Sequence, residues 1–121
     1  MSDDRHQKRI HRMQLLFAAG FSPTQQHASN PIDSEYIQAV LSERESIDAL
    51  IQSAAPERPL SEINKVDLAI LRVIMFESRH HNTPPKVLVN EGIELAKAYG
   101  SDASSKFVNG VLAKLLIDST K

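Results

Sequence analysis

The 121-residue sequence contains no cysteine, only four glycines, and only six aromatic residues, two tyrosines and four phenylalanines. Without cysteine the chain can form neither a disulfide framework nor a thiolate metal site, and this suits a reducing compartment such as the cytoplasm. The shortage of aromatic residues, together with abundant Ala, Leu, Ile, Lys and Glu, favours helices over a sheet.

Long apolar runs are also missing. No segment approaches the ~18 apolar residues of a membrane-spanning helix, and the charged start MSDDRHQKRIHR lacks the apolar region of a signal peptide. We therefore predict a cytoplasmic protein without a membrane segment. The length suits one domain over residues 1–121, because single domains usually have ~100–150 residues.

The motifs of common enzymes are absent: the sequence has no GxGxxG, GxxxxGK[ST], GxSxG or HExxH. Asp67 and Glu77 are ten residues apart, which places them on different faces of one helix and makes them a poor acid–base pair. His80 and His81 point about 100° apart on a helix, and no Cys or third His is near in sequence. We predict neither an enzyme nor a cofactor or metal.

Charge is unevenly distributed, although the net charge is only −1. Residues 5–12 contain four Arg or Lys and two His without an acid, whereas residues 32–62 contain seven acids and two arginines. A basic end and an acidic middle could face different partners. Solvated helix faces explain such a pattern equally well.

Apolar spacing and helix-breaking residues predict an antiparallel helical domain. The first helix is expected over residues 4–19, ending at Gly20 in a left-handed conformation. The second is expected over 33–54, with room for a break near Ser42. Residues 65–80 are apolar nearly all round and predict a central core helix.

The ends of the later helices carry recognisable signals. Ser61 or Asn64 can cap the helix at 65–80, and Thr83, followed by two prolines, can cap the next helix. Gly100 is expected to end that helix. Ser101 or Asp102 can then cap the last one, whose apolar stripe is Val108, Val111, Leu112 and Leu115.

On the first helix, apolar and basic residues form separate stripes. Ile10, Met13 and Phe17 share one face. The cations lie a quarter to a third of a turn away. We expect the helix to dock by the apolar stripe and to leave in solvent its basic stripe, which consists of Arg5, Lys8, Arg9 and Arg12.

Polar residues interrupt two otherwise apolar helices. Arg72 and Glu77 do so in the central helix, and Asn90 and Glu91 in the next. If buried, the charged residues need hydrogen-bonded partners, because an unpaired buried charge costs several kcal/mol.

The start of the last helix combines polar side chains, Lys106 and Phe107. Free backbone N–H groups at a helix N-terminus suit phosphate, and a phenylalanine can stack on an unpaired base. The alternative is that Phe107 is simply the first core residue of that helix.

The stretch from Lys65 to Lys114 resembles the C-terminal core of the NusB family, over about fifty residues in consistent order and spacing. The matching elements are Val66-Asp67, Ala69-Ile70-Leu71-Arg72, Phe76-Glu77, Thr83-Pro84, Lys86-Val87, Asn90-Glu91, Glu94-Leu95-Ala96-Lys97 and Lys106-Phe107-Val108-Asn109-Gly110-Val111-Leu112.

The resemblance implies an all-α fold, a compact bundle of about five to seven helices in two small helical subdomains. The basic N-terminal helix would occupy residues 1–20, a shortened variable helical segment 21–60, and the core helices 61–121. It also implies transcription antitermination, notably on ribosomal RNA operons. Family members bind boxA-type single-stranded RNA together with the ribosomal protein NusE, and the pair recruits other Nus factors to RNA polymerase.

On this basis we predict one RNA track across the first helix and the start of the last, on a continuous surface. Its residues are Arg5, Lys8, Arg9, Arg12, Lys106, Phe107 and Asn109. The protein partner is predicted to contact Asp67, Phe17 and Glu77.

Departures from the family pattern leave alternatives open. His6 and Gln7 interrupt the N-terminal arginine run, Phe17 stands where tyrosine is frequent, and residues 20–60 form a short segment. One alternative is a protein-interaction scaffold that has lost RNA binding and docks through the acidic residues 32–62. Another is an RNA-docking module for a separate RNA methyltransferase. An apolar patch left by a missing helix could also drive homodimerisation.

Overall fold

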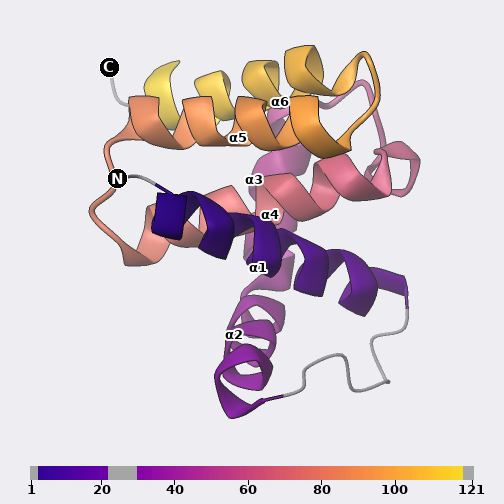
Figure 1. Cartoon of the computed structure of the whole chain (residues 1–121). Helices are drawn as coiled ribbons and strands as arrows, with labels where there is room; N and C mark the ends of the chain where they lie inside the picture. Colours follow the sequence, from indigo (N-terminus) through magenta and orange to yellow (C-terminus); the bar gives the residue numbers. More distant parts are fainter. Residues whose placement is uncertain (1–2, 22–29, 119–121) are drawn as a thin grey trace.

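The computed structural model describes residues 3–21 and 30–118, and within these ranges the chain is all-helical, as predicted. These ranges contain six α-helices and two shorter helical turns, arranged as in Figure 1. In chain order these are α1 (Asp3–Phe21), α2 (Pro31–Ser42), α3 (Arg44–Ala54), the 3₁₀ turn η1 (Leu60–Glu62), α4 (Lys65–His80), α5 (Pro85–Tyr99), α6 (Ser104–Leu112) and the π-helical turn η2 (Ala113–Ile117).

Three predicted boundaries are confirmed. Gly100 directly follows the last residue of α5 and is its C-cap. The break near Ser42 separates α2 from α3. Asn64 caps α4, because its side-chain oxygen accepts hydrogen bonds from the backbone N–H groups of Val66 at 2.8 Å and Asp67 at 3.4 Å.

Other predicted helix ends are wrong. Gly20 does not end α1, which continues to Phe21, and no glycine in the described ranges has a positive φ. Thr83 does not cap α5, because its hydroxyl donates to the Glu77 carboxylate at 2.7 Å instead. A hydrogen bond to the side chain of Glu77 in α4 has replaced the expected capping bond to the backbone of α5.

The predicted cap of the last helix is also wrong. α6 begins only at Ser104 and has no side-chain cap. Ser104 is buried, and its hydroxyl accepts a hydrogen bond from the backbone N–H of Ser101 at 2.9 Å. The serine therefore folds the preceding loop back onto the helix.

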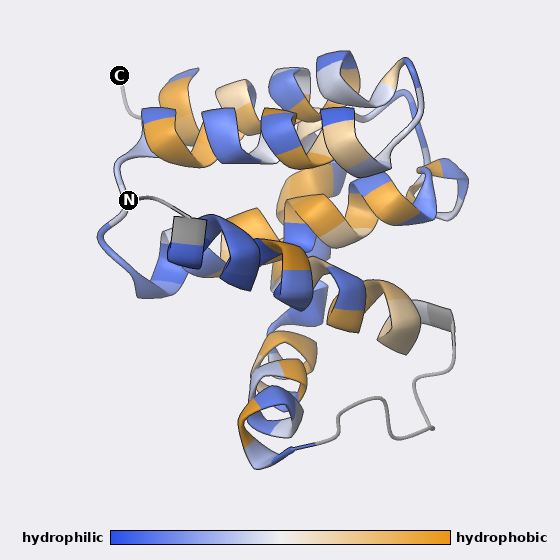
Figure 2. Ribbon diagram, in the orientation of Figure 1, coloured by the Kyte–Doolittle hydropathy of each residue, from blue (hydrophilic) through white to orange (hydrophobic). Residues whose placement is uncertain are grey.

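α4 lies at the centre of the molecule, with α1 on one side and the α5–α6 pair on the other (Figure 1). This confirms the prediction of a central core helix. Figure 2 colours much of α4 as hydrophobic. The buried apolar residues of α4 are Leu68, Ala69, Ile70, Leu71, Val73, Ile74 and Met75.

α2 projects from this body and packs against the C-terminal half of α1 (Figure 1). A second, smaller hydrophobic cluster joins the two helices through Leu15, Ala19 and Ile37, with Leu41 packed against it. None of the helices in the described ranges has the length and apolar character needed to cross a bilayer.

Candidate nucleic-acid interface

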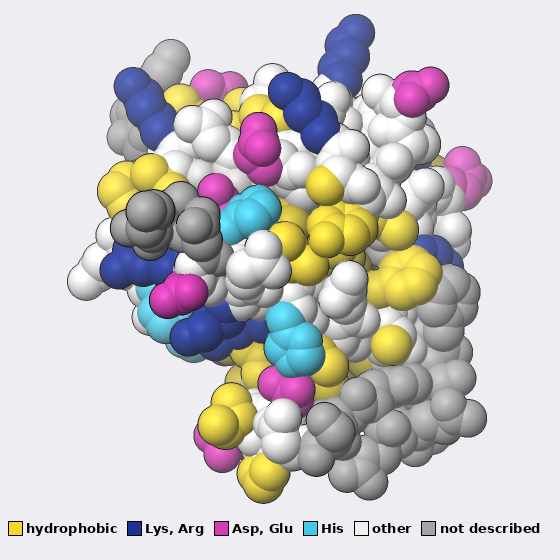
Figure 3. Space-filling model, in the orientation of Figure 1, with side chains coloured by type: hydrophobic (Ala, Val, Ile, Leu, Met, Phe, Trp, Pro, Cys, Tyr) yellow, Lys and Arg dark blue, Asp and Glu magenta, His cyan; other side chains and the backbone are white. Residues whose placement is uncertain are grey.

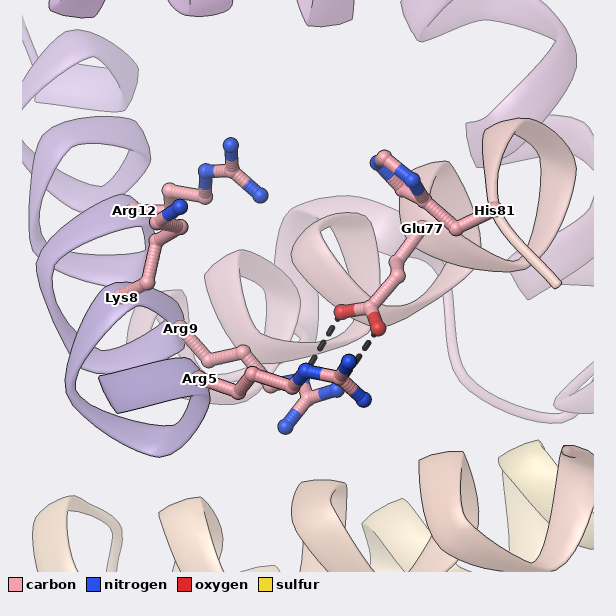
Figure 4. A pocket seen from close by; sticks show the side chains of 6 residues that line it. All are labelled: Arg5, Lys8, Arg9, Arg12, Glu77 and His81. Atoms are coloured by element: carbon pink, nitrogen blue, oxygen red, sulfur yellow. Dashed lines mark hydrogen bonds and ion pairs between the residues drawn. The ribbon is translucent and has the colours of Figure 1, made fainter. Parts of the chain in front are cut away.

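The predicted basic stripe borders a pocket of about 160 Å³ between α1 and the end of α4. Figure 4 shows Arg12 and His81 on opposite walls, with Glu77 between them. In Figure 3, Lys, Arg and His side chains lie close together around the N-terminal half of α1. The lining of this α1 pocket is Arg5, Lys8, Arg9, Arg12, Glu77 and His81.

Arg9 is not in solvent, and this part of the prediction is wrong. Its side chain is buried, and Nε and Nη2 donate to the two carboxylate oxygens of Glu77 at 2.8 and 2.7 Å. Nη1 donates to Glu91 at 3.0 Å. Arg9 precedes the buried residues Met13 and Leu16 by four and seven positions, so at 100° per residue it shares their face.

Glu77 is buried and fully paired, as its place in an apolar helix required. Burial by itself raises the pKa of Glu77, but hydrogen bonds from Arg9 and Thr83 outweigh it, and the net direction is downward. Both carboxylate oxygens already accept hydrogen bonds inside the chain. Glu77 is therefore a poor acceptor for the protein partner predicted to contact it.

Two further polar residues that interrupted apolar helices also have partners. Arg72 donates to Asp48 of α3 through two bonds of 2.9 and 2.8 Å. Glu91 accepts from Arg9 and also lies 2.9 Å from Nδ1 of His6. The contacts of Arg9, Glu77, Glu91 and His6 form one network, here called the Arg9 anchor, that joins α1, α4 and α5.

A second pocket, of about 480 Å³, lies at the opposite end of α4 and is here called the α6 pocket. Lys106 is exposed there, and Asn109 is exposed one turn further along α6. The α6 pocket is lined by Arg58, Glu62, Asn64, Asp67, Ser101, Ala103, Lys106 and Phe107.

Phe107 lies between the main core and Arg58. The ring is half-buried and packs against the main core. The guanidinium carbon of Arg58 lies 4.4 Å from the ring centroid, so Arg58 stacks over the ring. A planar cation therefore lies between the phenyl ring and any base that would stack there.

Asp67 is a buried acceptor in the α6 pocket. Only 3% of the residue is exposed, and among the described residues none donates a hydrogen bond to its Oδ1. Burial raises the pKa of Asp67, although a hydrogen bond from Ser104 and the charge of Arg58 oppose the shift. An incoming N–H donor would satisfy this atom.

The two pockets lie at opposite ends of α4. They share no lining residue. The α6 pocket reaches Asp67 near the start of α4, and the α1 pocket reaches Glu77 near its end. At 1.5 Å per residue these positions are roughly 15 Å apart along the helix.

Several acids of the middle segment are used inside the fold. Asp33 lies 2.8 Å from the ring nitrogen of His11, and Glu43 accepts from Arg79 at 3.0 Å. Asp48 pairs with Arg72 as described above. The acids of residues 32–62 that remain exposed are Glu35, Glu45, Glu57 and Glu62.

The remaining predicted residues lie elsewhere. Phe17 is half-buried against the main core and lines a smaller pocket of about 100 Å³ beside Lys65 and Arg72. His80 contacts Glu43 rather than His81, with 2.6 Å between the ring nitrogen and the carboxylate. Within residues 3–21 and 30–118, no group of three potential metal ligands is close enough to hold an ion.

Known proteins resemble this chain in both sequence and structure. The NusB family profile matches residues 6–116. The transcription antitermination protein NusB of Roseiflexus castenholzii is 49% identical over 73 residues, but these cover only 58% of this chain and about half (51%) of that relative. The protein of the same name from Chloroflexus aggregans is 32% identical, covering 96% of this chain and 89% of its own. The structure of T. maritima NusB superimposes with a TM-score of 0.80 at 25% identity, over 93% of this chain and 89% of that one.

Replacing Arg9 by methionine should lower the free energy of unfolding by about 3–5 kcal/mol, because Glu77 would remain buried without its cation. Urea denaturation measures this change. The double variant Arg9→Met/Glu77→Met should recover much of the loss. Arg5→Met, at an exposed position of the same helix, should change the stability by less than about 0.5 kcal/mol. Equal losses of stability from Arg5→Met and Arg9→Met would contradict the structural role of the Arg9 anchor.

The contribution of Glu77 should disappear in acid. Its pKa in the fold lies below the ordinary value of 4.5. The carboxylate therefore stabilises the fold above that value and loses this effect as the pH falls through the lower, folded pKa. The stability difference between wild type and Glu77→Gln should be constant above about pH 5 and shrink below about pH 4.5. A difference that persists undiminished in strong acid would refute the assignment.

Proposed function

This chain belongs to the NusB family, and we propose that it acts in transcription antitermination by binding boxA-type single-stranded RNA together with the ribosomal protein NusE. It would act as a cytoplasmic, non-enzymatic module that joins other Nus factors and RNA polymerase in the elongation complex. The observation that carries the proposal is the α1 pocket, where three cations surround an acid that is already neutralised inside the protein.

The α1 pocket supplies the phosphate-binding part of this function. Arg9 pairs with Glu77. Arg5, Lys8 and Arg12 line the same pocket, and among the described residues no carboxylate forms an ion pair with them. Clustered cations of this kind bind the sugar–phosphate backbone and release its counterions. Arg9 itself would act by fixing α1 rather than by touching RNA.

The α6 pocket supplies a surface for bases. Lys106 and Asn109 offer hydrogen-bond donors, and the Arg58–Phe107 stack offers a planar surface. Unpaired bases stack on guanidinium planes as well as on aromatic rings. An RNA reaching both pockets would span the length of α4, with phosphate contacts at one end and base contacts at the other.

The protein partner would cover the region around Asp67 and Phe17. Oδ1 of Asp67 is buried and lacks a donor among the described residues, so a backbone or side-chain N–H of the partner that reached it would satisfy it. Seating NusE beside the α6 pocket would extend the RNA surface there, which accounts for cooperative binding. Glu77, whose oxygens are occupied, has no part in this contact.

The alternative of a scaffold without RNA binding has less support. It relied on the acidic segment as a docking surface, but Asp33, Glu43 and Asp48 pair with cations or histidines of α1 and α4. Homodimerisation likewise lacks a specific surface, since the large apolar residues exposed in the described ranges, Ile32, Val87 and Tyr99, are distributed over α2 and α5.

RNA affinity alone should be modest and dependent on salt. With four or five phosphate contacts on a single strand, log K should fall against log salt with a slope of about −3. Adding NusE should strengthen binding by roughly 5–150-fold, equivalent to a coupling of about 1–3 kcal/mol. Fluorescence anisotropy of labelled boxA-type RNA across a salt series, with and without NusE, measures both quantities. Absence of any gain on adding NusE would refute the cooperative proposal.

Asp67→Ala should weaken NusE binding by about 1–3 kcal/mol, because the partner's donor would lose its acceptor. RNA binding by the chain alone should not change. Glu62→Ala, which removes an exposed acid from the same pocket, is the matched control and should have little effect. Isothermal titration of each variant with NusE makes the measurement, and equal losses for both variants would point to general charge rather than to Asp67.

A further inference from the structure

We propose that Tyr36 of α2 is a positioning residue that holds Arg12 ready for one backbone phosphate in the α1 pocket. The inference rests on the proposed RNA-binding function and adds to it. It gives a role to the middle segment of the chain, which the sequence placed outside the RNA surface.

The guanidinium group of Arg12 is restrained by a different kind of contact from that of Arg9. Within the described ranges, no carboxylate lies within ion-pair distance of Arg12. Its guanidinium carbon instead lies 4.6 Å from the centroid of the Tyr36 ring. The stack restrains the side chain, and no residue in the described part of the chain accepts a hydrogen bond from its guanidinium. Figure 4 shows the guanidinium facing His81 across the pocket.

The Tyr36 ring is itself fixed by its surroundings. It packs edge-on against Phe76 of α4, with 5.5 Å between ring centroids and an interplanar angle of 81°. The α1–α2 cluster around Leu15 and Ile37, and the contact between His11 and Asp33, hold α2 in place. Arg12 is therefore oriented before any ligand arrives, which reduces the entropy lost on binding.

The size and charge of the α1 pocket favour a phosphate over other ligands. Its volume of about 160 Å³ is below the ~300–1,000 Å³ typical of small-molecule sites. Arg5, Lys8 and Arg12 supply donors from α1, and His81 supplies another group from the opposite wall. The acid in the lining, Glu77, faces the buried Arg9. Such a site recognises the backbone and carries no base specificity.

The test compares variants of Arg12 and Tyr36 for binding to two labelled RNAs, a boxA-type oligonucleotide and an oligouridine of equal length. Arg12→Gln should weaken both RNAs by the same factor, about 3–10-fold, and reduce the magnitude of the salt slope by about 0.7, the value for one phosphate on a single strand. A loss confined to the boxA-type RNA would overturn the phosphate assignment.

Tyr36→Leu should weaken both RNAs by about 2–5-fold, since a cation–π contact of this kind has a modest effect. Tyr36→Phe keeps the ring and should bind like the wild type. The double variant Arg12→Gln/Tyr36→Leu should bind no more weakly than Arg12→Gln, because Tyr36 acts only through Arg12. Additive losses would overturn the positioning role.

Circular dichroism checks that Tyr36→Leu folds. If Tyr36→Leu does not fold, the variant Arg12→Lys is used in its place. Lysine keeps the positive charge but lacks the planar group that stacks on the Tyr36 ring. The variant should weaken binding by about 2–3-fold at an unchanged salt slope, and full affinity would count against Tyr36.

Lys106→Glu separates the two proposals. If it weakens RNA binding while Arg12→Gln and Tyr36→Leu do not, the phosphate subsite and the role of Tyr36 are wrong, and the proposed RNA binding stands through the α6 pocket alone. If the wild type binds neither RNA, with or without NusE, both are wrong.

Discussion

The ion pair between Arg9 and Glu77 is the contact on which the arrangement of this molecule depends. It lies where α1 crosses α4, and the bond to Glu91 extends it to α5. A buried charge pair contributes little net stability compared with apolar packing, but either partner alone would be costly to bury. The pair therefore restricts how α1 can be positioned along α4, because other positions of α1 would leave a buried charge without its partner.

That restriction has a consequence for the surface. Arg5 and Arg12 lie one turn on either side of Arg9, so fixing Arg9 also fixes where these two cations emerge. Because Arg9 neutralises Glu77, the acid at the base of the α1 pocket does not cancel their charge. One buried cation thus leaves the charges of Arg5 and Arg12 available to a polyanion, and the modest net charge of the chain conceals a locally basic site.

The two ends of the central helix α4 border pockets of different chemical character. Its C-terminal end borders the cationic α1 pocket, and its N-terminal end borders the α6 pocket with Asp67, Lys106 and the Arg58–Phe107 stack. Since α4 is held on several sides by other helices, the distance between these ends is rigid. A single-stranded RNA would change its conformation to fit the protein, because the RNA backbone is more flexible than α4.

The sequence by itself determined the helices, the central position of α4 and the need of Glu77 for a partner, because apolar periodicity and the cost of unpaired charge are local properties. It also contained the signal for burying Arg9, which shares a face with Met13 and Leu16, although basic residues nearby obscured it. Only the tertiary structure decided which charges pair. The contacts of Arg9 with Glu77, Arg12 with Tyr36 and Arg58 with Phe107 join residues far apart in the chain, and periodicity along one helix carries no information about its neighbours.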